Sequence, residues 1–177
     1  MNIHIQDPKV SLNNFDYVVA PEHDGLEGIN VLKSKGAIHY LTEAELLDNT
    51  NYLKPRIKKK KVIVFIAGGP NKYYDFNDEI IEKIFIQTKK NFIKQGYQLI
   101  FIPSMRTPKE TVDKAQDFFD DDQIIISDID KKAYLSALSL ADHIIVTCDS
   151  TSMISEAAMT GRPIYAVSYT HLRAHEP

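Results

Sequence analysis

Two hydrophobic periods alternate along the chain from residue 62 to residue 168. Residues 62–69, VIVFIAGG, are continuously apolar and end in two glycines, a pattern typical of a strand buried on both faces of a sheet. Residues 78–96 instead place apolar side chains at helical spacing, and Gly96 ends the pattern. Further strands are predicted at 97–104, 123–127, 143–147 and 162–168, and further helices at 108–119, at 131–141 and within 146–163. Strands that alternate with helices predict a parallel sheet covered on both faces.

The start of the helix at 108–119 has its own sequence signal. Thr107 is a good N-cap residue, Pro108 suits the first helical position, and Glu110 lies three residues after the cap. Together they predict a capping box.

The first 54 residues lack this alternation. They contain two extended segments (2–6 and 15–21), a loop rich in Gly, Pro and Asp (21–30) and one helix (42–49). We therefore expect residues 1–54 to be the C-terminal part of an earlier α/β domain. Residues 55–61 are interpreted as a basic linker, and residues 62–168 as a nearly complete Rossmann-like domain. The basic run at 56–61, RIKKKK, is typical of a solvated linker, with an anion-binding patch as the alternative.

Composition excludes several classes of protein. With 177 residues, 44% hydrophobic and 25% charged, the chain is neither a disordered tail nor a fibre. Its 21 basic and 24 acidic side chains leave a net charge of −3, which argues against nucleic acid or an anionic membrane as partner. A single cysteine excludes an internal disulfide and fits a reducing compartment. No apolar stretch approaches the roughly 20 residues of a transmembrane helix, and no signal peptide is evident, so we predict a cytoplasmic protein.

Three loops follow predicted strands, where open parallel sheets bind their ligands. The first, 67–76, carries Gly68 and Gly69, which allow backbone N–H groups to face an anion. The second, 103–108, places Arg106 beside Thr107. The third is the start of the last helix, where a helix N-terminus favours phosphate. Its candidate residues are Asp149, Ser150, Thr151, Ser152 and Glu156.

Each of these signals has a purely structural alternative. The glycine pair does not form G-x-G-x-x-G, the hydroxyl cluster is also what N-capping requires, and Glu156 could be an ordinary exposed helical residue. Arg106 could hold a carboxylate across a domain interface. The shared sheet edge of all three loops favours the binding interpretation.

Four segments carry a resemblance to a known family: 15–42, 62–74, 102–108 and 133–165. Their motifs are P-E-H-D, N-V and G-A-x-H, followed late in the chain by D-S-x-S-M-x-S-E-A-x-x-T-G-x-P. In order and spacing these motifs resemble the elongated-mitochondria family of mitochondrial fission factors. The resemblance implies a GT-B-like α/β fold, as in two-domain nucleotide-sugar glycosyltransferases, and a cytoplasmic, bacterial-type member. Plant relatives are fission factors that recruit a dynamin-related GTPase.

The resemblance also implies roles for the candidate residues. By similarity to GT-B enzymes, Glu156 would accept hydrogen bonds from ribose hydroxyls. Residues 150–152 would receive one phosphate of a nucleoside-diphosphate sugar, and Gly68 with Gly69 the other. The family pattern S-R-R-T-P reads Ser-Met-Arg-Thr-Pro at 104–108, so one of two arginines is missing. The resemblance ends after Ala166, and we expect residues 169–177 to be a non-native tail and the chain to be a fragment at both ends.

Catalytic residues are less evident than binding residues. His23 and Asp24 are the nearest to an acid–base pair, although a His-Asp step in a turn is also a common local hydrogen-bonding device. Cys148 is interpreted as a small packing residue. No Cys/His cluster suggests zinc, and a glycosyl transfer of this type has no obligatory metal or cofactor. Two hypotheses remain: a glycosyltransferase-like enzyme that uses a nucleotide sugar, and a non-catalytic binding or recruiting module. The sequence identifies no protein partner.

Overall fold

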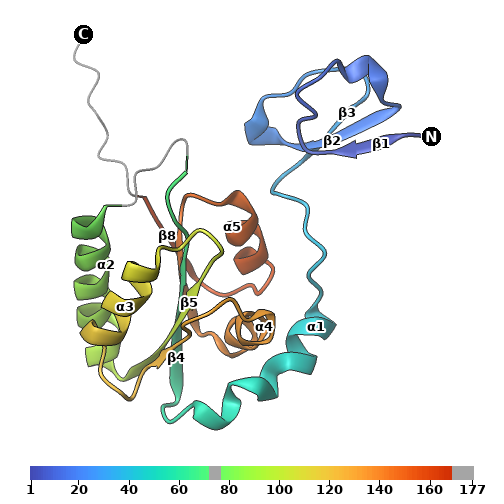
Figure 1. Cartoon of the computed structure of the whole chain (residues 1–177). Coiled ribbons are helices and arrows are strands. Elements are labelled where there is room, and N and C mark those ends of the chain that lie inside the picture. Colours follow the sequence, from blue (N-terminus) through green and yellow to red (C-terminus); the bar gives the residue numbers. More distant parts are fainter. Residues whose placement is uncertain (72–76, 169–177) are drawn as a thin grey trace. The chain divides into compact units, whose positions relative to one another are not determined.

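The computed structural model describes residues 1–71 and 77–168, which divide into two compact units. The first unit is Met1–Tyr40, and the second begins at Leu41. Both are built on parallel sheets (Figure 1). Within the described residues, no helix has the length and apolar character required to cross a membrane.

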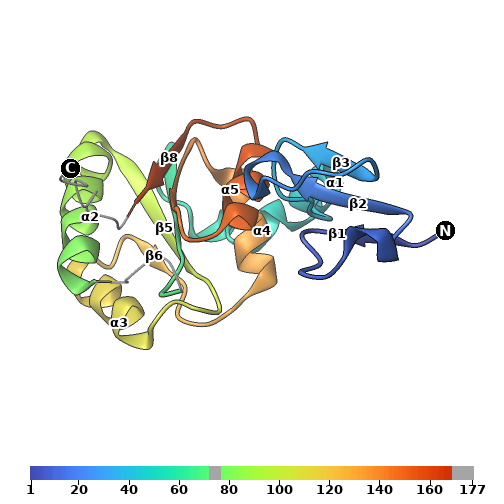
Figure 2. The same cartoon turned by 90° about the horizontal axis from the view of Figure 1, so that it is seen from above.

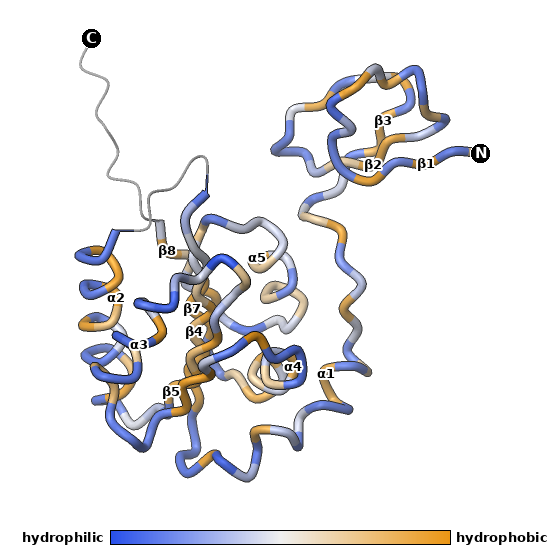
Figure 3. The backbone as a smooth tube through the Cα atoms, viewed as in Figure 1, coloured by the Kyte–Doolittle hydropathy of each residue, from blue (hydrophilic) through white to orange (hydrophobic). Residues whose placement is uncertain are grey.

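The second unit contains a five-stranded sheet of order β6-β5-β4-β7-β8. Every neighbouring pair of strands in it is parallel. The strands are β4 (Lys61–Ala67), β5 (Tyr97–Pro103), β6 (Ile124–Ile125), β7 (His143–Thr147) and β8 (Ile164–Val167). The central strands form a continuous hydrophobic layer (Figure 3). The predicted parallel sheet is therefore confirmed.

Helices cover both faces of this sheet (Figures 1 and 2). On one face lie α2 (Asp78–Asn91) and α3 (Lys109–Phe118), and on the other lie α4 (Lys131–Leu140) and α5 (Thr151–Ala158). Strand β4 shows why its sequence is apolar throughout: Ile63, Phe65 and Ala67 join the core under α2 and α3, whereas the alternate residues join the core under α4. Two apolar faces leave no polar alternation for the strand to show.

The predicted capping box of α3 is wrong. Pro108 is the N-cap, and no side chain caps the helix. The Thr107 hydroxyl instead lies 2.8 Å from the carbonyl oxygens of both Ala67 and Gly68, and it accepts a hydrogen bond from the Ser104 amide at 2.8 Å. Thr107 therefore joins the β5–α3 loop to the end of β4 and does not cap the helix.

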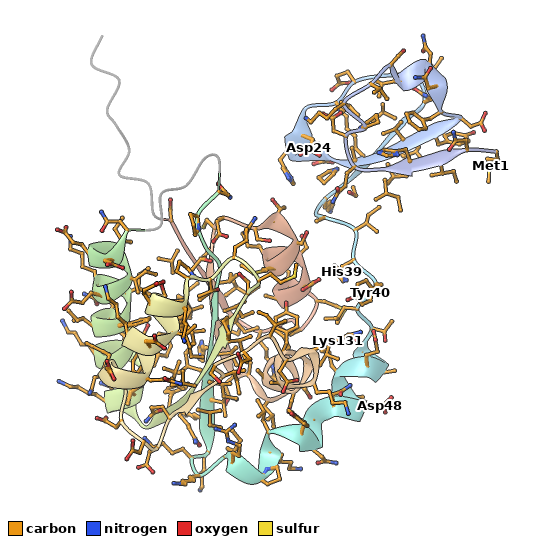
Figure 4. All side chains as sticks on the ribbon, in the orientation of Figure 1. Met1, Asp24, His39, Tyr40, Asp48 and Lys131 are labelled. Carbon is orange, nitrogen blue, oxygen red and sulfur yellow. The ribbon has the colours of Figure 1, made fainter. Side chains whose placement is uncertain are left out.

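Residues 41–57 belong to the second unit, which differs from the expected boundary near residue 54. The segment contains α1 (Glu43–Asn49) and two short 3₁₀ turns, Thr50–Tyr52 and Lys54–Arg56. Leu41, Leu46 and Leu53 are buried in the core beside α4. Nζ of Lys131 at the start of α4, a residue labelled in Figure 4, also lies 3.7 Å from Oε1 of Glu45 on α1. The predicted helix at 42–49 is confirmed. It was expected to belong to the first domain, whereas its buried Leu46 packs in the core of the second unit.

The basic segment expected to be a linker is packed as well. Buried Gln98 of β5 accepts hydrogen bonds from the backbone amides of Lys58 and Lys59 at 2.7 and 3.3 Å. Lys61 already forms the first residue of β4. The backbone here is held by the sheet, while Lys58, Lys60 and Lys61 are exposed and Lys59 is half-buried. The expected tail at 169–177 lies outside the described residues.

The first unit is a three-stranded sheet of order β1-β2-β3. Its strands, all parallel, are β1 (Ile3–Ile5), β2 (Tyr17–Pro21) and β3 (Val31–Ser34). The two extended segments predicted near the N-terminus form β1 and β2, whereas β3 had no sequence prediction. Asn30 supports this unit by donating to the carbonyls of Leu12 and Phe15, both at 2.9 Å.

Candidate functional site

Three predicted loops meet at the carboxyl edge of the five-stranded sheet. Strands β5, β4 and β7 are neighbours, so the loops that follow them lie side by side. Hydrogen bonds join these loops through Gly69, Arg106 and Asp149. The shared sheet edge that we expected for these loops is present.

The Asp149 carboxylate is the centre of this cluster, and its side chain is 0% exposed. Its Oδ1 accepts a hydrogen bond from the Thr147 hydroxyl at 2.5 Å. Its Oδ2 accepts from the Gly69 amide at 3.2 Å and lies 2.6 Å from Nη2 of Arg106, forming an ion pair. A buried carboxylate requires this kind of compensation from a charge and several donors. Asp149 therefore acts inside the protein, as the joint between three loops.

The two glycines are required by the chain's own groups. A Cβ atom at Gly68 would lie 2.0 Å from Oδ1 of Asp149, and one at Gly69 would lie 1.8 Å from the Arg106 carbonyl oxygen. Their amides also have internal partners, because Gly68 donates to the Thr147 hydroxyl at 2.7 Å and Gly69 donates to Asp149. The absence of side chains at these glycines thus allows Asp149 and the Arg106 backbone to pack against the loop.

Arg106 bonds to groups inside the protein through Nη2, while part of its side chain is exposed to solvent. Its Nη2 donates both to the Asp149 carboxylate and to the Asp149 carbonyl oxygen, the latter at 3.2 Å. Asn71 donates to the same carbonyl oxygen at 2.9 Å. The Arg106 side chain is nevertheless 44% exposed. Arg106 does hold a carboxylate, as the structural alternative supposed, but that carboxylate belongs to the same unit.

The hydroxyl cluster at the start of α5 has two kinds of member. Ser150 is the N-cap, and its hydroxyl accepts from the Met153 amide at 3.5 Å. Thr151 and Ser152 lie in the first turn and are exposed. The capping explanation therefore accounts for Ser150, whereas the next two hydroxyls lie at an open helix N-terminus that favours negative charge.

Glu156 lies further along α5 and is partly buried. Its Oε2 accepts a hydrogen bond of 2.5 Å from the hydroxyl of Tyr134 on α4. Glu156 is thus a carboxylate held in place by a hydrogen bond, and it is not an ordinary exposed helical residue. Tyr134 and Thr147 had no sequence prediction, because each acts through a partner that only the fold brings near.

His23 and Asp24 form a local pair in the first unit. They lie in a 3₁₀ turn (Glu22–Asp24) that follows β2 and ends at Gly25, whose φ is +66°. The His23 Nε2 atom is 3.5 Å from Oδ1 of Asp24, and the side chains are 48% and 32% exposed. Figure 4 shows the Asp24 side chain on this turn. The pair has the geometry of a local turn contact, and its imidazole is accessible to solvent.

Cys148 does not have the character of a nucleophile. Partial burial raises the pKa of its thiol, and the neighbouring Asp149 carboxylate raises that pKa further. The thiol therefore stays protonated near neutral pH, where a nucleophile needs a thiolate. Among residues 1–71 and 77–168, no group of three or more His, Cys, Asp or Glu side chains is arranged to hold a metal ion.

Comparison with known proteins gives the family. The model of the mitochondrial fission ELM1 family matches residues 1–175. The chain belongs to this family. It is 28% identical over 152 residues to the uncharacterized protein RP120 of Rickettsia prowazekii, covering 81% of the chain and 42% of that relative. It is 23% identical over 198 aligned positions to the mitochondrial fission protein ELM1 of Arabidopsis thaliana, covering 97% of the chain and 46% of that protein. The chain thus spans less than half the length of these relatives.

Solved structures share the fold of this family member. The UDP-GlcNAc 2-epimerase of Neisseria meningitidis, bound to UDP-GlcNAc, matches with a TM-score of 0.57 at 14% identity, over 90% of the chain and 46% of the enzyme. MnaA of S. aureus with UDP matches with a TM-score of 0.51 at 14% identity, over 85% of the chain and 41% of that protein. At this identity the likeness concerns the fold alone. The chain therefore has the α/β architecture of half of a GT-B protein, as the resemblance implied.

Proposed function

We propose that this family member binds a nucleoside-diphosphate sugar at the carboxyl edge of its five-stranded sheet. The observation that carries the proposal is the joint placement on α5 of an exposed hydroxyl-rich N-terminus and a held carboxylate, Glu156. A helix N-terminus suits a phosphate, and a carboxylate suits sugar hydroxyls. Structures of the same fold contain UDP or UDP-GlcNAc, which makes this ligand class the first to test.

The two phosphates have different surroundings in this proposal. One phosphate contacts Ser150, Thr151 and Ser152 and the amides of the first turn of α5. The other lies against the turn of Gly68 and Gly69 and near the exposed part of Arg106. The two glycine amides already have protein partners, so the turn only allows the phosphate to come close to the backbone. Arg106 supplies the positive charge.

Glu156 accepts hydrogen bonds from the ribose in this proposal. Among the described residues, Tyr134 is the one hydrogen-bond partner of its carboxylate, so Oε1 remains available. Thr107 and Asp149 act indirectly, because they hold the β4, β5 and β7 loops in register.

We further propose that the intact protein is a glycosyltransferase-like enzyme in which His23, paired with Asp24, serves as the acid–base group. A transfer to an acceptor hydroxyl needs a base of this kind, and His23 has an exposed imidazole beside a carboxylate. The competing function is a binding or recruiting module without turnover. It is favoured by the internal use of Arg106, whose Nη2 is already bonded to the carboxylate and the carbonyl oxygen of Asp149.

Calorimetric titration of the full-length protein with UDP, ADP, GDP, CDP and their sugars tests the binding proposal. Micromolar affinity for one nucleotide, lost in Glu156→Ala and kept in Glu110→Ala, would support it. Glu110 is an exposed glutamate on α3 and serves as the matched control. If no nucleotide binds, or if the two variants behave alike, the proposal is wrong.

Transfer is tested separately from binding. With the nucleotide sugar identified, release of nucleoside diphosphate is followed in the presence of candidate acceptors. An enzyme loses turnover in His23→Ala while the affinity for nucleotide stays unchanged. Binding that persists without turnover in the wild-type protein would favour the recruiting module.

A further inference from the structure

The contact between Tyr134 and Glu156 links two helices that lie on the same face of the sheet. Tyr134 is in the first turn of α4, Glu156 is in the middle of α5, and the hydroxyl donates to Oε2 at 2.5 Å. We propose that Tyr134 is a positioning residue that holds Glu156 toward the vicinal hydroxyls of a ribose and so sets a preference for ribonucleotides. This inference rests on the proposed function of the site.

Tyr134 is itself firmly placed, because α4 is anchored at its start. The N-cap Asp130 accepts from the Ala133 amide at 3.0 Å and from the Tyr52 hydroxyl at 2.7 Å. The next turn of α4 is fixed through buried Ser136, which accepts from the Leu53 amide at 3.0 Å and donates to the Thr50 carbonyl at 2.9 Å. A hydroxyl on such a helix offers a fixed point to which a flexible glutamate can bind.

The consequence for Glu156 is a restricted carboxylate. A glutamate on a helix surface has several rotamers, and each hydrogen bond to a ligand then costs the entropy of selecting one of them. The hydrogen bond from Tyr134 engages Oε2 and leaves Oε1 available among the described residues. An ionised carboxylate has about four lone-pair positions, so one can be used by Tyr134 while others accept from two adjacent hydroxyls. A sugar without these hydroxyls cannot benefit from this arrangement.

A purely structural role for Tyr134 makes a different prediction. If the contact only joined α4 to α5, its loss would loosen the whole site and weaken every nucleotide equally. The preference between nucleotides with and without ribose hydroxyls is the quantity that separates the two roles.

The experiment compares UDP with 2′,3′-dideoxy-UDP in titrations of the full-length wild-type protein and of Tyr134→Phe. Phenylalanine keeps the ring and removes the hydroxyl. The wild type should prefer UDP by about tenfold or more, as expected for hydrogen bonds to a charged group. In Tyr134→Phe the affinity for UDP should fall by about three- to tenfold, whereas that for dideoxy-UDP should stay unchanged. Glu156→Gln should reduce the preference at least as far.

Three outcomes would overturn the inference, and they are distinguishable. Equal losses for both nucleotides would show a structural role, and unchanged affinity for both would show no role. In either case binding by the wild type and its loss in Glu156→Ala would leave the proposed function intact. If the wild type binds none of UDP, ADP, GDP and CDP, the proposed function fails and the role of Tyr134 fails with it. Thermal unfolding of each variant confirms that the comparisons are made on folded protein.

Discussion

Two neighbouring parts of the candidate site use similar residues for different purposes. The inner cluster consists of Gly68, Gly69, Arg106, Thr107, Thr147 and Asp149, whose polar groups are bonded to one another. The outer group consists of Thr151, Ser152 and Glu156, of which the first two are exposed and the third is held by Tyr134. Only Ser150, the N-cap of α5, separates the two in sequence.

The difference shows why a motif is not a list of ligand contacts. Asp149 and Ser152 are three positions apart in one stretch of sequence, yet one side chain is fully buried and the other is exposed. A charged residue just before a helix, such as Asp149, can stabilise the preceding loop from inside the protein. The residues of the first helical turn are then exposed and available to bind a ligand. Changes in the inner cluster should therefore reduce stability first of all, whereas changes in the outer group should reduce binding with little loss of stability.

The largest expected effect is that of Gly69→Ala. The new Cβ would lie 1.8 Å from the Arg106 carbonyl oxygen, so the backbone of one loop has to move. We expect a loss of about 3 kcal/mol in the free energy of unfolding, measured by urea denaturation, as for severe overpacking. Gly96→Ala is the control, because its φ is positive but no atom lies within 4 Å of the added Cβ. It should cost about 1 kcal/mol, and equal losses in the two variants would contradict the account.

Asp149→Asn should have the next largest effect. The substitution keeps the shape but removes the charge that faces Arg106 at 2.6 Å. Since Arg106 remains partly solvated, we expect a loss of about 2 kcal/mol rather than the full cost of an isolated buried charge. A double-mutant cycle with Arg106→Gln measures the coupling. The exposed pair of Lys58 and Asp122, 3.0 Å apart, is the control, and its coupling should be much weaker because solvent screens both charges.

Thr107 should follow with an intermediate effect. Thr107→Val removes the hydroxyl that joins the β5–α3 loop to the end of β4, which should cost about 1–2 kcal/mol in urea denaturation. Thr107→Ser keeps the hydroxyl and should recover most of that stability. Full stability in Thr107→Val would mean that these hydrogen bonds do not hold the loop.

Ser152→Ala should have the smallest effect on stability. As an exposed first-turn residue it should change the free energy of unfolding by less than about 0.5 kcal/mol. Its affinity for UDP should fall by about three- to tenfold if it contacts phosphate. Ser150→Ala, at the N-cap two positions earlier, should cost about 1 kcal/mol of stability in addition to its phosphate contact. A reversed pattern in these two serines would remove the distinction between the inner cluster and the outer group.

Sequence patterns predicted the strands and helices of the second unit because the spacing of its apolar residues differs clearly between strands and helices. The strands near residues 63, 99 and 145 are apolar on both faces, and the helices between them have distinct ends. Strand β3 had no such signal, since it is short and only partly buried. The boundary at Tyr40 was missed because α1 is a short amphipathic helix, and its sequence does not tell which unit its apolar side covers.

The sequence predicted that the candidate residues share one sheet edge, but it did not predict which of them bond to one another. Glycines at a strand end and hydroxyls at a helix start can be recognised from the sequence, and the structure brings both to the same sheet edge. The inward direction of Asp149 is not visible, because it depends on Arg106, which lies 43 positions earlier in the chain. Tyr134 was missed for the same reason, as its link to Glu156 crosses 22 positions.

The most direct test measures stability and UDP affinity together for Asp149→Asn and Glu156→Gln, both of which replace a carboxylate by an amide. Glu156→Gln should lose most UDP binding while its free energy of unfolding falls by less than about 1 kcal/mol. Asp149→Asn should lose about 2 kcal/mol of stability. Wild-type UDP affinity in Glu156→Gln, or unchanged stability in Asp149→Asn, would contradict the division between an inner structural cluster and an outer binding group.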